Sequence, residues 1–234
     1  MDTGSTTGPT KGAADGETLV LIPTALEERR VEDHGGIDPA LARTLVCGFG
    51  VVAAAARATQ LILELRPRRV ILLGICGAYD TERHPVGSAM IFTRTSIDGV
   101  GAGEGASFRG PSGLGFPQWP GSSDTREAPI EEELALDAPA RTAEALLLTT
   151  CAASDSDAEA RTRLERHPSA VAEDMEGFAV AMAGALTSVP VTIVRGVSNR
   201  VGDRDPSHWQ IPGALAAARK LVLDLLEAGA GTSS

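Results

Sequence analysis

The sequence predicts an α/β fold in one domain. Short apolar runs, such as residues 19–23 and 190–197, alternate with longer segments of helical pattern, such as the Ala-rich residues 51–65. The chain has 234 residues, of which 43% are apolar, and this is enough for one large hydrophobic core. Several expected strands end in glycine or polar residues, which indicates a ligand site at one edge of the sheet.

The expected domain covers residues 17–228, between tails at residues 1–16 and 229–234 that have few apolar side chains and are expected to be disordered. Six strands are predicted at residues 19–23, 44–47, 69–73, 87–93, 145–150 and 190–197, with a further strand leading through 171–172. Helices are predicted from Thr24 as N-cap and at residues 51–65, 138–144, 157–166, 177–187 and 211–227.

Residues 98–124 are dense in glycine, proline and serine, with aromatic residues among them. A structureless segment of this length inside a domain is unusual, and such segments are often binding loops or lids. We therefore expect either a binding loop or a flexible insertion here.

Composition argues against several classes of partner. The formal charge is −10 and the basic residues are scattered, so nucleic-acid binding is not expected. No apolar run approaches the roughly 20 residues of a membrane span. The glycine- and threonine-rich start has no apolar signal core, and we expect a cytoplasmic protein with no membrane partner.

The three cysteines are widely spaced and form no CxxC pair, and the four histidines have no ligand spacing. We therefore expect buried small cysteines, no disulfide framework and no bound metal.

Two polar clusters stand at the ends of apolar runs between residues 171 and 209. One holds Glu176, and the other runs from Arg195 to Asn199. The helical residues 177–187 lie between them, which predicts a strand–helix–strand unit with parallel strands and a right-handed crossover. Glu176 and Asn199 are therefore expected to face one pocket.

Glycine-bearing turns at residues 48–50 and 74–77 raise the question of a phosphate-binding loop. Neither is a GxGxxG or a GxxxxGK[ST] motif, and a glycine after a strand more often only permits a tight turn. No nucleotide cofactor is expected. A GxSxG elbow is also absent from the sequence, so acyl-enzyme chemistry has no support.

Five segments together resemble the superfamily of purine nucleoside phosphorylases and methylthioadenosine/S-adenosylhomocysteine nucleosidases, over about residues 19–228. Within it, residues 199–205 with Trp209 look like the branch that hydrolyses futalosine in the alternative menaquinone pathway, as does the glycine-rich loop that ends at residues 114–117. The five segments are residues 23–28, 47–50, 74–77, 173–177 and 195–199.

This resemblance implies a single-domain, three-layer fold with a central mixed, partly barrel-like sheet flanked by helices. It also implies an N-glycosyl hydrolase without a cofactor, active on a small nucleoside and assembled as a homo-oligomer. By resemblance, Glu176 holds the ribose hydroxyls, Met175 packs under the sugar, and Arg195 fixes the carboxylate or lines the ribose pocket. Ser198, Cys76 and Gly77 complete the expected substrate-binding set.

Asn199 bears on the base that leaves. The adenine-specific relatives have an aspartate at this position, whereas an asparagine amide can donate to O6 of a 6-oxo purine while its carbonyl accepts from a ring N–H. A site built for one hydrogen-bond pattern rejects the mismatched analogue. We therefore expect hypoxanthine as the leaving base, with Asn199 as a catalytic residue.

The nucleosidases activate water with a glutamate just after the first strand. An ungapped match puts Arg29 there, and a one-residue shift gives Glu28, which we predict as the second catalytic residue. Arg29 and Arg30 leave a phosphorylase open as the alternative, since phosphorylases bind phosphate with arginines in comparable loops. Nucleosidase activity on methylthioadenosine and an inert nucleoside-binding protein are further alternatives.

Futalosine has an aromatic carboxylate beyond its ribose. The glycine-rich loop suggests that Arg109, with Phe108 or Trp119, meets that end of the substrate.

Overall fold

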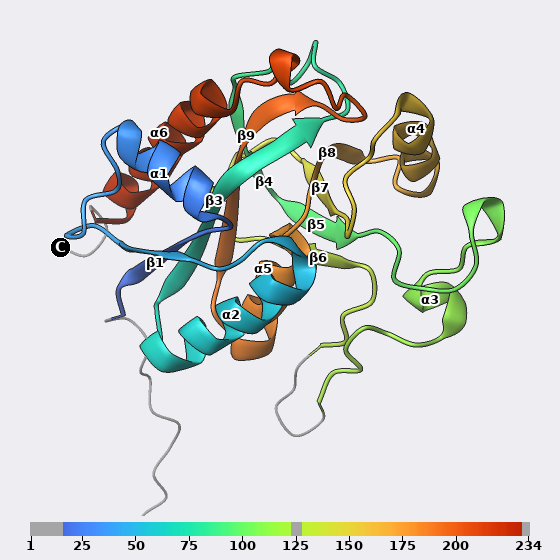
Figure 1. Ribbon diagram of the computed structural model, residues 1–234. Helices are drawn as coiled ribbons and strands as arrows, with labels where there is room; N and C mark the ends of the chain where they lie inside the picture. The colour runs from blue at the N-terminus through green and yellow to red at the C-terminus, as the bar shows by residue number, and fades with distance from the viewer. Residues whose placement is uncertain (1–15, 123–127, 231–234) are drawn as a thin grey trace, which may run out of the picture.

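A twisted, nine-stranded mixed sheet forms the centre of the molecule (Figure 1). The structure is a computed structural model that describes residues 16–122 and 128–230. The strands are β1 (Thr18–Ile22), β2 (Arg43–Val46), β3 (Arg69–Ala78), β4 (Ala89–Phe92), β5 (Arg94–Ile97), β6 (Glu133–Ala135), β7 (Leu146–Thr149), β8 (Ala170–Asp174) and β9 (Val191–Arg200). The α-helices are α1 (Ala25–Asp33), α2 (Gly50–Leu65), α3 (Pro111–Leu114), α4 (Asp157–Arg166), α5 (Gly177–Thr187) and α6 (Ile211–Ala230).

Strand β3 organises the sheet because it pairs with three neighbours. Its first half lies parallel to β1, its last two residues pair antiparallel with β8, and β9 runs parallel to it along the other edge. The carboxyl-terminal part of β3 therefore lies between the carboxyl-terminal parts of β8 and β9. This arrangement brings the polar ends of three strands to one place.

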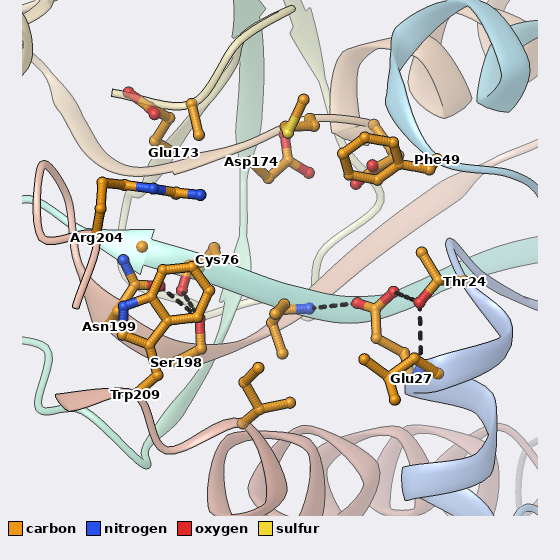
Figure 2. Close-up of a pocket in the computed structure, with 17 residues that line it drawn as sticks. Thr24, Glu27, Phe49, Cys76, Glu173, Asp174, Ser198, Asn199, Arg204 and Trp209 are labelled. Carbon is orange, nitrogen blue, oxygen red and sulfur yellow. Dashed lines mark hydrogen bonds between the residues drawn. The ribbon is translucent and has the colours of Figure 1, made fainter. Parts of the chain in front are cut away.

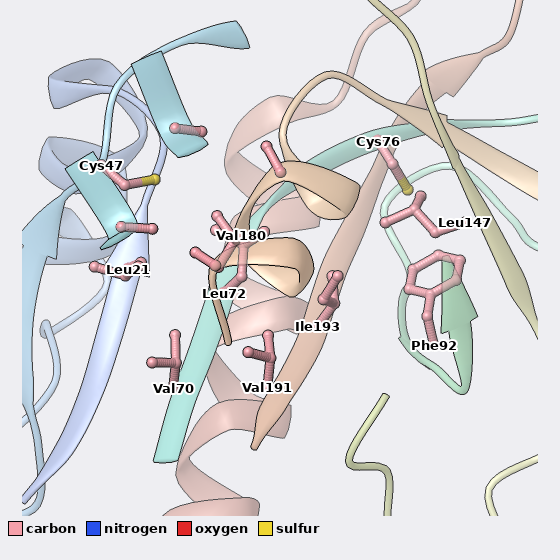
Figure 3. Close-up of a cluster of buried hydrophobic side chains, with 14 of the residues drawn as sticks. Leu21, Cys47, Val70, Leu72, Cys76, Phe92, Leu147, Val180, Val191 and Ile193 are labelled. Carbon is pink, nitrogen blue, oxygen red and sulfur yellow. The ribbon is translucent and has the colours of Figure 1, made fainter. Parts of the chain in front are cut away.

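Helices cover both faces of the sheet, which confirms the expected three-layer architecture. On one face α2 and α5 pack on an apolar cluster that includes Leu72, Val180 and Ile193 (Figure 3). On the other face α6 and α1 cover a second cluster, to which Val31 and Leu215 contribute. Gly196 in β9 permits the close approach of α6, because a Cβ atom there would lie 2.1 Å from the carbonyl oxygen of Ala214.

Three expectations about the secondary structure are wrong. Strand β3 continues through residues 74–78, which were expected to form a loop, because β9 and β8 supply hydrogen-bond partners up to Ala78. Residues 138–144 form turns rather than a helix. The preceding segment is tied to the sheet by hydrogen bonds from the Leu136 and Asp137 amides, and Pro139 and Arg141 (φ 94°) follow.

The third correction concerns direction. Strand β8 is antiparallel to β3 whereas β9 is parallel to it, so the two strands joined by α5 do not run parallel as expected. The polar clusters still meet, because both strands end beside the same part of β3.

The expected tails fall largely outside the described residues, which begin at residue 16 and end at residue 230. The last helix reaches Ala230, three residues past its expected end, so residues 229 and 230 belong to the helix. Within the described part of the chain, no helix is both long and apolar enough to cross a membrane.

Candidate active site

A cavity of about 300 Å³ opens where β3, β8 and β9 end, next to the start of α1 and of α2 (Figure 2). Both polar clusters that the sequence predicted at the ends of apolar runs contribute residues to this cavity. The residues that line it are Thr24, Leu26, Glu27, Phe49, Ile75, Cys76, Gly77, Ala153, Glu173, Asp174, Met175, Glu176, Ser198, Asn199, Arg204, Trp209 and Ile211. Met175, Glu176, Ser198, Asn199, Cys76 and Gly77 therefore lie where the sequence predicted them.

Glu27 is a buried carboxylate at the first turn of α1. Thr24 caps this helix by accepting from the Glu27 amide, and its hydroxyl donates to Glu27 Oε2 at 2.7 Å. The Ile75 amide of β3 donates to Glu27 Oε1 at 3.1 Å. These bonds fix the carboxylate at one side of the cavity, as Figure 2 shows.

The prediction of Glu28 at this position is wrong. Glu28 lines a different cavity together with Val31 and Ile37, on the far side of α1. Adjacent helical residues point about 100° apart, so only one of the two glutamates can face the cavity. Glu27 and Val31 are one turn apart and both buried, and this spacing is the sequence signal that favours Glu27. Arg29 and Arg30 are exposed and line none of this cavity.

Arg195 is fully buried behind the cavity and holds two carboxylates in place. Its Nε donates to Asp174 Oδ2 at 3.0 Å, and one terminal nitrogen donates to Glu176 Oε2 at 3.2 Å. Glu176 Oε1 accepts from the Gly50 amide at 2.9 Å. Of the two placements considered for Arg195, the structure gives the one that fixes the carboxylate, because Arg195 does not line the cavity.

The other terminal nitrogen of Arg195, Nη1, has no hydrogen-bond partner among the described residues although it is buried. It lies beside Gly74: a Cβ atom at that glycine would be 1.9 Å from Arg195 Nη1 and 3.0 Å from Glu27 Oε1. The absence of a side chain at Gly74 therefore allows the guanidinium to pack against the backbone of β3. A buried donor without a partner costs free energy.

Electrostatics distinguish Glu176 from an ordinary surface carboxylate. Burial raises the pKa of Glu176 to about 7, and the neighbouring Asp174 and Glu27 charges add to the rise, while Arg195 and the Gly50 amide oppose it. Burial also raises the pKa of Cys76 to about 12, so its thiol is protonated at neutral pH and is no nucleophile.

Asn199 lies at the opposite side of the cavity from Glu27 (Figure 2). Its amide nitrogen donates to the Arg200 carbonyl at 2.8 Å, and its oxygen accepts from the Ser198 hydroxyl at 2.7 Å. These two bonds orient the amide and leave one N–H donor and one acceptor position for a ligand. A Cβ atom at Gly77 would lie 3.1 Å from Val201 Cγ2, so the glycine permits the close packing of Val201, next to the strand that holds Asn199.

Arg204 and Trp209 line the same side as Asn199, and they were not among the predicted site residues. The Arg204 guanidinium lies over the Trp209 ring, 4.9 Å from its centroid. A cation and an aromatic residue five positions apart, just after Asn199, are the sequence signal for this pair.

The suggested role of the glycine-rich loop is not supported by the geometry. Phe108 lines a separate cavity and carries Arg166 over its ring at 5.3 Å, while Trp119 lines another cavity. Neither they nor Arg109 line the cavity that holds Glu27 and Asn199.

A buried ion-pair network surrounds Glu173, which lines the cavity. Glu173, at the end of β8, accepts from Arg163 at 3.0 Å, from Tyr79 at 2.9 Å and from the Ser154 amide at 2.7 Å. Arg163 also lies 3.4 Å from Asp98. This network attaches α4 to the sheet edge next to the cavity.

The arrangement has the groups that cleavage of an N-glycosidic bond requires. Carboxylates can stabilise the positive charge that develops on a sugar, and an amide with free donor and acceptor positions can bind a departing base. Among the described residues, no group of three or more His, Cys, Asp or Glu side chains is arranged to hold a metal ion.

Comparison with known proteins agrees with this chemistry. The model of the phosphorylase superfamily matches residues 31–228, and the chain belongs to this superfamily. Within it, the chain is similar to the futalosine hydrolase of Streptomyces coelicolor, with 36% identity over 76% of this chain and 75% of the relative. It is 25% identical to the 5'-methylthioadenosine/S-adenosylhomocysteine nucleosidase of Maridesulfovibrio salexigens, over 92% of this chain and 96% of the relative.

The fold is shared with solved structures of the same superfamily. The native structure of futalosine hydrolase from Helicobacter pylori matches with a TM-score of 0.70 and 13% identity, over 91% of this chain and 98% of the other. The predicted mixed-sheet fold and the predicted superfamily are therefore confirmed.

Proposed function

We propose that this protein hydrolyses the N-glycosidic bond of futalosine and releases hypoxanthine and dehypoxanthine futalosine. The observation that carries the proposal is the pairing, in one cavity, of buried carboxylates on one side with an oriented asparagine amide on the other. The similarity to the Streptomyces coelicolor hydrolase supports the same substrate.

The reaction assigns a task to each side of the cavity. As the bond from the ribose carbon to the base nitrogen breaks, its electron pair leaves with the purine and positive charge builds on the sugar. Ionised Glu176 accepts hydrogen bonds from the ribose hydroxyls and stabilises that charge, and Met175 packs under the sugar. Asn199 donates to O6 of the base and accepts from the ring N–H that forms as the base takes up a proton from solvent water.

Glu27 is the proposed general base. Glu27 lines the cavity, and its carboxylate would orient a water molecule held there. The water oxygen forms the new bond to the ribose carbon, and its proton passes to Glu27. We assign this role to Glu27 in place of Glu28.

Three features favour hydrolysis over phosphorolysis. Arg29 and Arg30, the candidate phosphate ligands of the sequence, are exposed and line none of the cavity. Arg195 already neutralises Asp174 and Glu176, which leaves one free nitrogen rather than a cationic pocket for a dianion. Four acidic residues line the cavity, and they would repel phosphate.

The second candidate is hydrolysis of methylthioadenosine or S-adenosylhomocysteine, which the Maridesulfovibrio salexigens relative favours. Asn199 argues against it, because its orientation offers one donor and one acceptor rather than a carboxyl group.

The experiment is incubation of the purified protein with futalosine in phosphate-free buffer while free hypoxanthine is measured by chromatography. Hypoxanthine release without phosphate supports the proposal. Release only after phosphate is added would make the protein a phosphorylase, and turnover of methylthioadenosine in preference to futalosine would favour the second candidate.

We also propose that the protein is cytoplasmic, acts in menaquinone biosynthesis and functions as a homo-oligomer. Exposed apolar side chains on α2 support an oligomer: Val52, near Phe49 at the start of the helix, is 81% exposed, and Leu63, near its end, is 62% exposed. Light scattering on the purified protein tests this, and a monomeric mass at micromolar concentration would refute it.

A further inference from the structure

Arg204 is a cation in a cavity lined otherwise by acids and neutral groups. Among the described residues that line the cavity, it is the one lysine, arginine or histidine. No described acidic side chain lies within ion-pair distance of it, although Asp203 and Asp205 are its chain neighbours and pair with His208 instead. The guanidinium is therefore available to a ligand.

The guanidinium is also held in a defined orientation. Its carbon lies 4.9 Å from the centroid of the Trp209 ring, and Trp209 is fixed by a hydrogen bond of 3.1 Å from its indole nitrogen to the Asp203 carbonyl. A guanidinium stacked on an aromatic face keeps its N–H donors at its edge free. The stack thus presents fixed donors at this side of the cavity.

This side is the one that holds Asn199, as Figure 2 shows, and it is opposite Glu27. Asn199 has one N–H left for a ligand after its bond to the Arg200 carbonyl. The oxygen of a 6-oxo purine has two lone pairs and gains negative charge as the base departs. The single N–H of Asn199 satisfies only one of these two lone pairs.

We propose that Arg204 is a second specificity-determining residue that donates a charge-assisted hydrogen bond to the 6-oxygen of the purine base. This inference rests on the proposed hydrolysis of a 6-oxo nucleoside. Arg204 lies on the same side of the cavity as Asn199, and its positive charge would stabilise the negative charge that O6 gains as the base departs. It disfavours a 6-amino base, because a guanidinium has donors only and would face another donor.

The test compares Arg204→Ala and Arg204→Lys with wild type on futalosine, inosine and the 6-amino analogue of futalosine. Loss of a charge-assisted hydrogen bond predicts that Arg204→Ala lowers kcat/KM for both 6-oxo substrates by about ten- to a hundred-fold. The 6-amino analogue is expected to lose no activity and to gain up to about three-fold, because its amino group no longer faces a guanidinium, and lysine restores part of the loss on the 6-oxo substrates. Arg161→Ala, on the exposed face of α4, is the control for removal of an arginine.

Two outcomes would overturn the inference. Equal losses on 6-oxo and 6-amino substrates would mean that Arg204 only maintains the loop. A loss on futalosine with inosine unaffected would mean that Arg204 binds the carboxylate end of the substrate instead.

Binding of the free bases separates this inference from the proposed function. Calorimetry is expected to show that Arg204→Ala weakens hypoxanthine binding and does not weaken adenine binding. If wild type failed to hydrolyse futalosine and yet showed this dependence, the proposed substrate would be wrong and the role of Arg204 would stand. Unchanged hypoxanthine binding in Arg204→Ala would refute the role of Arg204 alone.

Discussion

Glu27 is held by bonds from the chain itself, so its chemistry is separable from its contribution to folding. The Ile75 amide and the Thr24 hydroxyl both donate to it. A glutamine at this position keeps an oxygen that can accept from the Ile75 amide but loses the basic carboxylate.

We expect Glu27→Gln to lower kcat for futalosine by at least about a hundred-fold, as is usual for loss of a general base, while KM changes by less than about five-fold. Steady-state kinetics measure both values. Glu28→Gln is the matched control, because Glu28 faces a different cavity and is expected to leave kcat unchanged. The reverse pattern in the two variants would return the role to Glu28.

Asn199 sets the preference for the base. Asn199→Asp keeps the size of the side chain and its bond from Ser198 but replaces the amide donor by a carboxyl group. The ratio of kcat/KM for futalosine to that for its 6-amino analogue is expected to fall by at least about ten-fold. An unchanged ratio would show that the amide does not select the base.

Most site residues were predictable from sequence because the apolar runs form strands, and the carboxyl ends of neighbouring strands lie close together in the sheet. Glu176 follows β8, Asn199 lies near the end of β9, and the two do line one cavity. Which of two adjacent glutamates faces that cavity depends on the rotation of α1, which the packing of Val31 decides. The Arg204–Trp209 stack lies in an irregular loop, where no periodic pattern reports side-chain direction.

At the scale of elements, α4 is attached to the sheet mainly by charge. Its residue Arg163 is buried and contacts both Glu173 and Asp98. Asp98 is also bound by His167 and Arg166. Burial alone would raise the pKa of Asp98, but these hydrogen bonds hold it well below its usual range. A helix held in this way is sensitive to loss of one partner.

Arg163→Ala leaves Glu173 buried without its cation, and we expect the free energy of unfolding to fall by about 3 kcal/mol. Urea unfolding measures the change. Arg161→Ala, two residues earlier and exposed, is expected to change it by less than about 0.5 kcal/mol. A loss of similar size in both variants would contradict the role assigned to the network.

Long apolar patterns predicted the helices well, and short ones did not. The Ala-rich α2 and the uniformly apolar α5 agree with expectation, whereas the predicted helix at residues 138–144 was wrong. Seven residues that contain Pro139 cannot outweigh the backbone bonds that hold Leu136 and Asp137 to the sheet. The short strands β5 and β6 were missed because they are polar for most of their length or carry a charge, with the sequences RTSI and ELA, and show no apolar run.

At the scale of the whole molecule, the architecture was predictable while the strand directions were not. Alternating patterns give the three layers, but the antiparallel pairing of β8 with β3 depends on where β3 extends past β1. Sequence periodicity carries no information on that extension. The family resemblance supplied the mixed sheet that the local patterns could not.

Glu176 couples the activity and stability of the molecule to pH in opposite directions. Because the ionised form stabilises the sugar, kcat/KM is expected to fall about ten-fold per pH unit below about 7. The folded pKa lies above the ordinary value of 4.5, so the fold binds the proton more tightly than the unfolded chain does. This group therefore lowers the free energy of unfolding as pH rises from about 4.5 to about 7.

The comparison of wild type with Glu176→Gln isolates that stability change. Thermal unfolding at several pH values is expected to show wild type losing stability relative to the variant between pH 5 and 7.5, with no further relative change above that range. A constant difference, or an activity profile that is flat down to pH 5.5, would contradict the raised pKa of Glu176.

The most direct test of the central claim is the ratio of kcat/KM for futalosine to that for its 6-amino analogue, measured in phosphate-free buffer. Hydrolysis of a 6-oxo nucleoside at a site built around Asn199 predicts a ratio well above about ten, with hypoxanthine and the free sugar product formed in equal amounts. A ratio below one, or no turnover until phosphate is added, would contradict the account.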